Sequence, residues 1–124
     1  MGAQADYQVI LDIMKILVRS EFLALPAGTV FSKYEPYAFD DLSIKGGTIQ
    51  PDSDFFYQQL TDSVECSSSD ELRKILSSAV SSGSSIELDL YSTSRDGEFK
   101  KNQLFAVWEH RDVERLILRL QATL

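Results

Sequence analysis

The sequence has little of the chemistry that small proteins use for metal or disulfide sites. Its 124 residues include one cysteine, Cys66, and one histidine, His110. A single cysteine excludes an intrachain disulfide, and one cysteine with one histidine cannot form a structural zinc site from those ligand types. We therefore expect no cofactor and no metal, and a reducing cytoplasm as the compartment.

Long apolar runs and a surplus of basic residues are also missing. The apolar stretch that begins at Val9 is interrupted by Asp12, Lys15 and Arg19, so it predicts neither a membrane span nor a signal peptide. The chain carries 12 Lys and Arg against 19 Asp and Glu, a formal net charge of -7. Because affinity for DNA and anionic lipid comes mainly from Lys and Arg, we expect no direct binding to nucleic acid or to membranes.

What is present is the composition of an ordinary globular domain. Hydrophobic residues make up 44% of the chain and charged residues 25%. These values lie far from those of disordered chains, and the length suits one domain, residues 1–124.

Hydrophobic spacing predicts the order of helices and strands. The three predicted helices cover residues 6–23, 69–82 and 111–122. The predicted strands cover residues 29–34, 38–45, 55–60, 86–91 and 99–109. We therefore expect an α+β fold with a mainly antiparallel sheet of about five strands, on which an N-terminal, a middle and a C-terminal helix are packed.

Short motifs mark several boundaries of these elements. Ser68 and Glu71 have the spacing of a capping box at the start of the middle helix, and Gly83 suits the left-handed residue after its end. The pairs at 46–47 (Gly-Gly) and 96–97 (Asp-Gly) predict tight hairpin turns.

The negative charge is concentrated in one segment. Residues 34–71 contain nine carboxylates and a single cation, Lys45, whereas the remainder of the chain is close to balanced. The same segment contains six of the aromatic residues. Aromatic anchors within a charged rim are typical of protein-binding surfaces, so we expect a protein partner with a basic surface. The predicted partner-binding residues are Tyr34, Glu35, Tyr37, Asp40, Asp41, Asp52, Asp54, Tyr57 and Asp62.

Other roles for these residues stay open at this point. Phe39 and Phe55 could fill the core while the acids keep the protein soluble. Asp52, Glu98 and Lys100 have the residue types of a PD-(D/E)xK nuclease site, in which carboxylates bind magnesium. A hydrolytic enzyme is therefore the alternative to a non-catalytic binding protein. The sequence also leaves open a homodimer formed through an edge strand or the last helix.

Residues 25–60, with the stretch LPAGTVFSKYEP, resemble small phage and prophage accessory proteins, among which anti-CRISPR and other anti-defence inhibitors are found. Toxin-neutralising immunity proteins are similar in size and charge. The resemblance implies a compact, phage-encoded inhibitor in the host cytosol. Such a protein would block a basic, nucleic-acid-binding surface of a host defence complex without catalysis.

Overall fold

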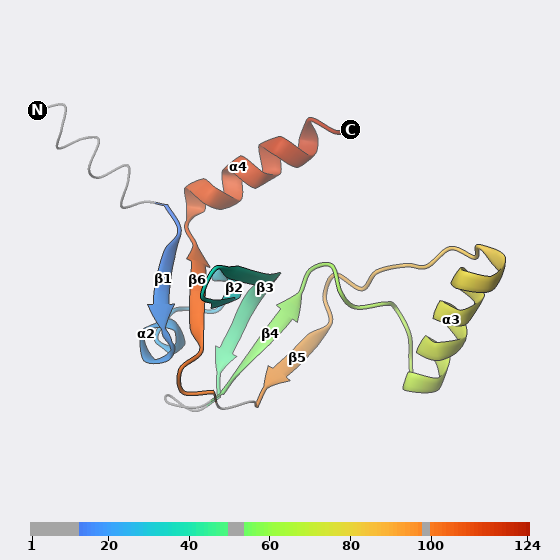
Figure 1. Cartoon of the computed structure of the whole chain (residues 1–124), viewed down its shortest axis with the longest axis horizontal. Coiled ribbons are helices and arrows are strands. Elements are labelled where there is room, and N and C mark those ends of the chain that lie inside the picture. Colours follow the sequence, from blue (N-terminus) through green and yellow to red (C-terminus); the bar gives the residue numbers. More distant parts are fainter. Residues whose placement is uncertain (1–12, 50–53, 98–99) are drawn as a thin grey trace, which may run out of the picture.

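A six-stranded antiparallel sheet forms the body of the protein (Figure 1). The computed structural model describes residues 13–49, 54–97 and 100–124. In chain order the elements are β1 (Lys15–Val18), α2 (Arg19–Leu23), β2 (Val30–Glu35), β3 (Ala38–Thr48), β4 (Phe55–Gln59), α3 (Ser69–Ser82), β5 (Thr93–Asp96), β6 (Leu104–Trp108) and α4 (His110–Gln121). The strand order is β1-β6-β2-β3-β4-β5, which confirms the predicted α+β class and the antiparallel sheet.

The core lies on one face of this sheet, the inner face, beneath the short helix α2. Phe22 of α2 is fully buried, and its ring centroid lies 4.7, 5.1 and 4.0 Å from those of Phe31, Phe55 and Phe105. These three rings come from β2, β4 and β6. One side chain therefore joins the helix to three strands, and the tilted, edge and stacked ring geometries are those that aromatic pairs prefer.

Charged groups are buried beside this aromatic core. The Asp96 carboxylate lies 3.9 Å from Arg19 Nη1 and 3.5 Å from Lys33 Nζ, and its side chain is 1% exposed. Lys45 Nζ donates to the Gly46 carbonyl and to Thr48 Oγ1, and burial lowers the pKa of this lysine. The inner face is thus only partly apolar, which leaves a small hydrophobic core.

The N-terminal helix predicted at 6–23 is wrong over the described residues. Lys15–Val18 form strand β1 against β6, and only Arg19–Leu23 are helical, while residues 6–12 lie outside the described part. The β-branched Ile16 and Val18 favour a strand. In a run as short as β1 the apolar residues fit a helix and a strand equally well, so periodicity alone does not distinguish the two kinds of element.

Two predicted hairpins also differ from the structure. β3 continues through Gly46 and Gly47 to Thr48, where an added Cβ on Gly46 would come within 3.0 Å of Phe56 Cβ. Glycine is therefore used here for close approach between strands, not for a turn. β5 and β6 are not partners either: β5 pairs with β4 at one edge, and β6 lies between β1 and β2.

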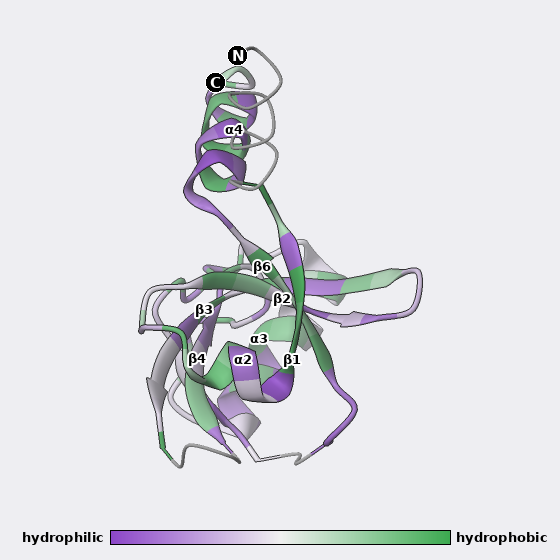
Figure 2. Cartoon of the chain, turned by 90° about the vertical axis from the view of Figure 1, so that its left-hand side faces the viewer, coloured by the Kyte–Doolittle hydropathy of each residue, from purple (hydrophilic) through white to green (hydrophobic). Residues whose placement is uncertain are grey.

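The two long helices extend away from the sheet (Figure 1), as Figure 2 also shows for α4, which corrects the prediction that they pack on it. α3 has the predicted limits, and one half of the predicted capping box is present: Ser68 Oγ accepts from Glu71 N at 3.1 Å, and Gly83 after the helix has φ 71°. The Glu71 carboxylate accepts from Ser67 N at 3.1 Å instead of from Ser68 N. Hydrogen bonds from Ser67 lower the pKa of the Glu71 carboxyl. α4 begins one residue before its predicted start, and neither helix contains a buried residue.

Candidate protein-binding surface

The turn between β2 and β3 places an aromatic ring at the most exposed point of the hairpin. Tyr37 is 98% exposed and has φ 69°, a left-handed conformation that non-glycine residues rarely adopt. Its N–H donates to the Tyr34 hydroxyl at 3.2 Å, and the Tyr34 ring lies 5.1 Å from that of Phe39. The two rings at the base of the turn thus support it, and strain in an exposed turn is often retained for function.

The strain at Tyr37 leads to a stability prediction. Tyr37→Gly should raise the free energy of unfolding by about 1 kcal/mol, because glycine adopts positive φ without a Cβ clash. Tyr37→Ala removes the same ring but keeps Cβ, so it should bring no such gain. Urea denaturation of both variants checks this, and equal stability of the two would contradict the strained turn.

Carboxylates flank the turn on both strands. Glu35, Asp40 and Asp41 are exposed, and Asp41 N donates to Asp40 Oδ1 at 2.8 Å. Phe39, between them, is 59% exposed. We call these residues, together with Tyr37, the hairpin surface. Four of them belong to the predicted partner-binding set, and the fifth, Phe39, was assigned to the core by the alternative interpretation.

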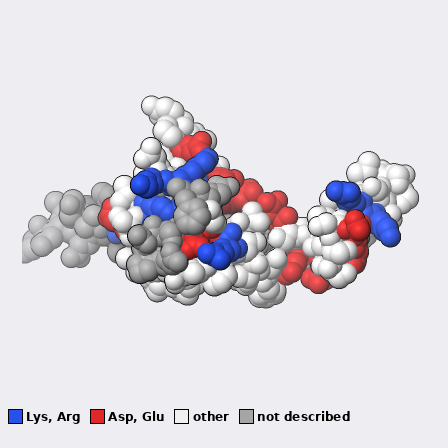
Figure 3. Space-filling view, turned by 90° about the horizontal axis from the view of Figure 1, so that it is seen from below, with Lys and Arg blue, Asp and Glu red and all other residues white. Residues whose placement is uncertain are grey.

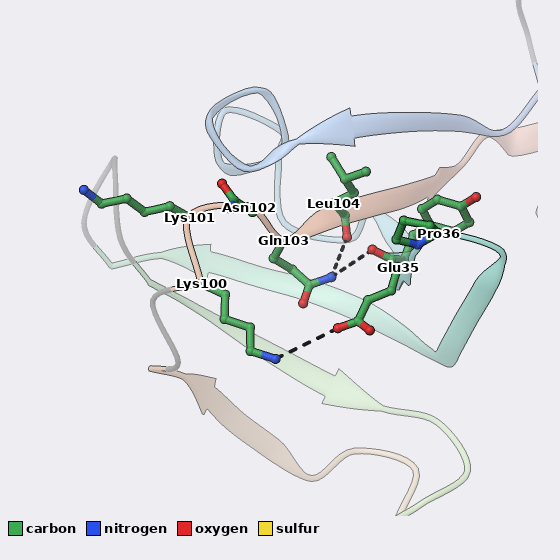
Figure 4. A pocket seen from close by; sticks show the side chains of 8 residues that line it. Glu35, Pro36, Lys100, Lys101, Asn102, Gln103 and Leu104 are labelled. Atoms are coloured by element: carbon green, nitrogen blue, oxygen red, sulfur yellow. Dashed lines mark hydrogen bonds and ion pairs between the residues drawn. The ribbon is translucent and has the colours of Figure 1, made fainter.

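Three adjoining hollows lie beside the hairpin surface. The largest, about 390 Å³, is lined by Glu35 and by the segment that leads into β6 (Figure 4). There Lys100 Nζ lies 3.9 Å from Glu35 Oε1, and Gln103 Nε2 donates to the carbonyls of Tyr34 and Leu104 at 3.1 and 2.9 Å. The other two hollows, about 290 and 200 Å³, share Lys33 and Asp40 in their linings.

The region of the hairpin surface and its hollows therefore carries charges of both signs near β6 and mainly negative charge toward β4. Lys100 and Lys101 line the largest hollow, and Glu35 is partly neutralised by Lys100. Asp40 and Asp41 line the smallest hollow with the half-buried Tyr57. Figure 3 shows basic and acidic side chains adjacent on the body of the sheet, with acidic ones continuing toward α3. Sequence reasoning missed this local neutralisation, because Lys100 and Glu35 are far apart in the chain.

Asp54 does not belong to the binding surface, which corrects the prediction. Its side chain is 1% exposed and forms an ion pair with Arg95, whose Nε donates to Asp54 Oδ2 at 2.6 Å. The neighbouring Phe55 is in the core. Asp62 is exposed but lies beyond β4, where Gln59 Nε2 donates to its Oδ2 at 3.1 Å. Asp52 lies outside the described residues.

The alternative interpretation, a nuclease-like site, depends mainly on residues beyond the described part of the chain. Asp52 and Glu98 lie outside it, and Lys100 faces Glu35. The single histidine, His110, lies on an exposed face of α4, where its Nε2 is 3.1 Å from Glu114 Oε2. Within residues 13–49, 54–97 and 100–124, no three His, Cys, Asp or Glu side chains gather as a metal site requires. No helix in these ranges is long and apolar enough to cross a membrane.

Comparisons with known proteins add no family or relative. No family model matches the chain, and neither the curated proteins nor the solved structures contain a match. The functional argument therefore depends on the geometry of the hairpin surface.

Proposed function

We propose that this protein is a non-catalytic binding protein whose hairpin surface docks on a basic surface of a protein partner. The observation that carries the proposal is the strained, fully exposed Tyr37 beside exposed Phe39, in a rim of carboxylates. Aromatic side chains with few rotatable bonds supply contact area at low entropic cost, and the surrounding acids orient and accelerate encounter with cations.

The charge of the rim suggests which ligand the partner would no longer bind. Asp40 and Asp41 project carboxylates from adjacent positions of β3, and a basic surface that accepts them cannot hold phosphates at the same place. The most specific form of the proposal is therefore an inhibitor of a nucleic-acid-binding protein. An anti-defence inhibitor of the phage kind that residues 25–60 resemble would act in this way.

Charge reversal on the hairpin tests the proposal. Proteins captured from a bacterial lysate by the wild-type chain would be identified and then titrated with purified variants. Asp40→Lys with Asp41→Lys should weaken binding of the captured partner roughly tenfold or more and reduce its dependence on salt, because the rim would then repel a basic surface. Glu21→Lys with Glu114→Lys makes the same change in net charge at exposed sites away from the hairpin.

The two double variants give opposite expectations. The control variant should bind nearly as well as the wild type, and heparin, a polyanion, should compete with the wild-type chain for the partner. If the hairpin variant binds as tightly as the control variant, the hairpin is not the contact surface and the proposal fails. Thermal unfolding of each variant verifies that the fold is retained.

A further inference from the structure

Residues 60–92 form an arm that leaves the sheet after β4 and returns at β5, with α3 at its far end (Figure 1). The two limbs of the arm are bonded to each other. Glu65 N donates to the Glu87 carbonyl at 2.8 Å, and Asp89 N donates to the Ser63 carbonyl at 2.7 Å. The ribbon formed by these bonds directs the arm outward and keeps α3 off its own sheet.

The arm exposes apolar side chains that its sequence pattern would bury. Residues 86–91 alternate as a half-buried strand does, yet they form only one isolated bridge, Val64 to Leu88. α3 is amphipathic and has no buried residue. The exposed large apolar residues of the arm are Leu76, Val80, Ile86, Leu88, Leu90 and Tyr91. So many exposed apolar side chains in one segment of the chain indicate a binding surface.

The sheet has a matching surface on the side opposite the core, which we call the open face. Cross-strand pairs place Ile16 beside Ala106, and Val18 beside Leu104. Because alternate residues of a strand share a face, the apolar residues of four adjacent strands lie together here. The open face consists of Ile16, Val18, Val30, Tyr34, Phe39, Leu42, Ile44, Leu104, Ala106 and Trp108, with the buried Ser32 between Leu42 and Ala106.

No described helix covers the open face. At its rim Ile16, Val18 and Phe39 are 43%, 47% and 59% exposed, whereas Ala106 near its centre is buried, and α4 contacts the sheet mainly at β6. Antiparallel sheets usually present polar side chains on a face that meets water, so this apolar face lacks a layer. The described residues thus contain a sheet face without a covering helix and an amphipathic helix that packs on no sheet.

The two surfaces agree in size and in charge. α3 has 14 residues, which corresponds to about 21 Å, and the four strands of the open face span roughly 15 Å between outer axes. The arm carries six carboxylates against two cations, Arg73 and Lys74. Exposed cations lie at both ends of β6, in the middle of the open face: Lys100 and Lys101 precede this strand and Arg111 follows it. An anionic arm on this face would meet opposite charge.

We propose that two copies of the chain exchange arms, so that α3 of each copy packs on the open face of the other. The outward direction of the ribbon disfavours closure within one chain, and a twofold dimer closes both pairs of surfaces at once. The partner is a second copy because each chain carries both halves of the contact. The open face shares one residue, Phe39, with the hairpin surface, and the proposal does not depend on Tyr37 or on the carboxylates there.

Oligomeric state, measured by light scattering after size exclusion, is the first test. The wild-type chain should have twice the mass of one chain. Leu76→Glu on α3 and Ile16→Glu on the open face should each give a monomer, because both introduce a charge into the contact. Ser81→Glu, on the opposite face of α3, is the matched control and should remain a dimer. Circular dichroism shows whether each variant is folded, since the changed side chains are exposed in the single chain.

Disulfide trapping identifies the contact. In a Cys66→Ser background, a chain with Val18→Cys mixed with a chain with Val80→Cys should form a covalent heterodimer on oxidation. A monomeric wild type would overturn the proposal, as would a dimer that tolerates both glutamate substitutions or a disulfide formed within a chain that carries both cysteines. Asp40→Lys with Asp41→Lys should leave the dimer intact, so failure of the proposed function and failure of this inference are distinguishable.

Discussion

Phe22→Ala should lower the free energy of unfolding by about 3 to 5 kcal/mol, the largest effect that we expect from one substitution. Phe22 is fully buried and contacts the rings of Phe31, Phe55 and Phe105. Removal of its ring leaves a cavity at the point where α2 meets three strands. Because domains of this size have a total stability of about 5 to 15 kcal/mol, the variant should be near the limit of folding.

Urea denaturation followed by circular dichroism measures this loss, and the proper control is another phenylalanine. Phe39→Ala removes the same ring from an exposed site, where it pairs only with the Tyr34 ring among the aromatic contacts of the described residues, so the loss should be about 0.5 to 1.5 kcal/mol. A Phe22→Ala variant as stable as Phe39→Ala would show that α2 does not form part of the core.

Asp96→Ala should be the second most destabilising substitution, with a loss of about 3 kcal/mol. The Asp96 carboxylate is buried between Arg19 and Lys33, so its removal leaves two cations in contact with the core without this counter-charge. The loss should come mainly from uncompensated charge. Lys33→Met in the Asp96→Ala background should therefore recover part of the stability.

An exposed acid, Asp62, is the control for the buried Asp96. Asp62→Ala breaks one hydrogen bond at the surface and should change stability by about 0.5 kcal/mol or less. If chemical denaturation gives the same midpoint for Asp96→Ala and Asp62→Ala, the buried ionic cluster does not contribute to the fold. If Asp96→Ala with Lys33→Met has the same midpoint as Asp96→Ala alone, the loss of stability comes from packing and not from uncompensated charge.

Local signals in the sequence predicted the two long helices well. The Ser68 and Glu71 pair, Gly83 and the apolar spacing of residues 113–120 act within a few residues, so their effects do not depend on the rest of the fold. What these helices pack against could not be read in the same way. An amphipathic stripe indicates that a helix packs against something, but it does not indicate whether that partner lies in the same chain.

Long-range pairings explain the errors. Asp54 resembles its acidic neighbours in the sequence, and its burial follows from Arg95, which lies 41 residues further along the chain. The strand β1 was predicted as part of a helix because its partner β6 is near the other end of the sequence. Glu35, Asp40 and Asp41 were placed correctly at the surface because a turn between two strands exposes the residues around it whatever the distant contacts are.

The pairing of β1 with β6 also bears on how the protein is made. β1 has its hydrogen-bonding neighbour in β6, a strand that the ribosome synthesises only after β2, β3, β4 and the whole arm. β2, β3 and β4 can pair in sequence order, but β6 must then insert at the edge of β2 before β1 has a neighbour. Such non-local pairing is slow compared with hairpin formation. During synthesis the nascent chain therefore has an incomplete sheet with exposed core phenylalanines. Chaperones bind exposed apolar surface of this kind.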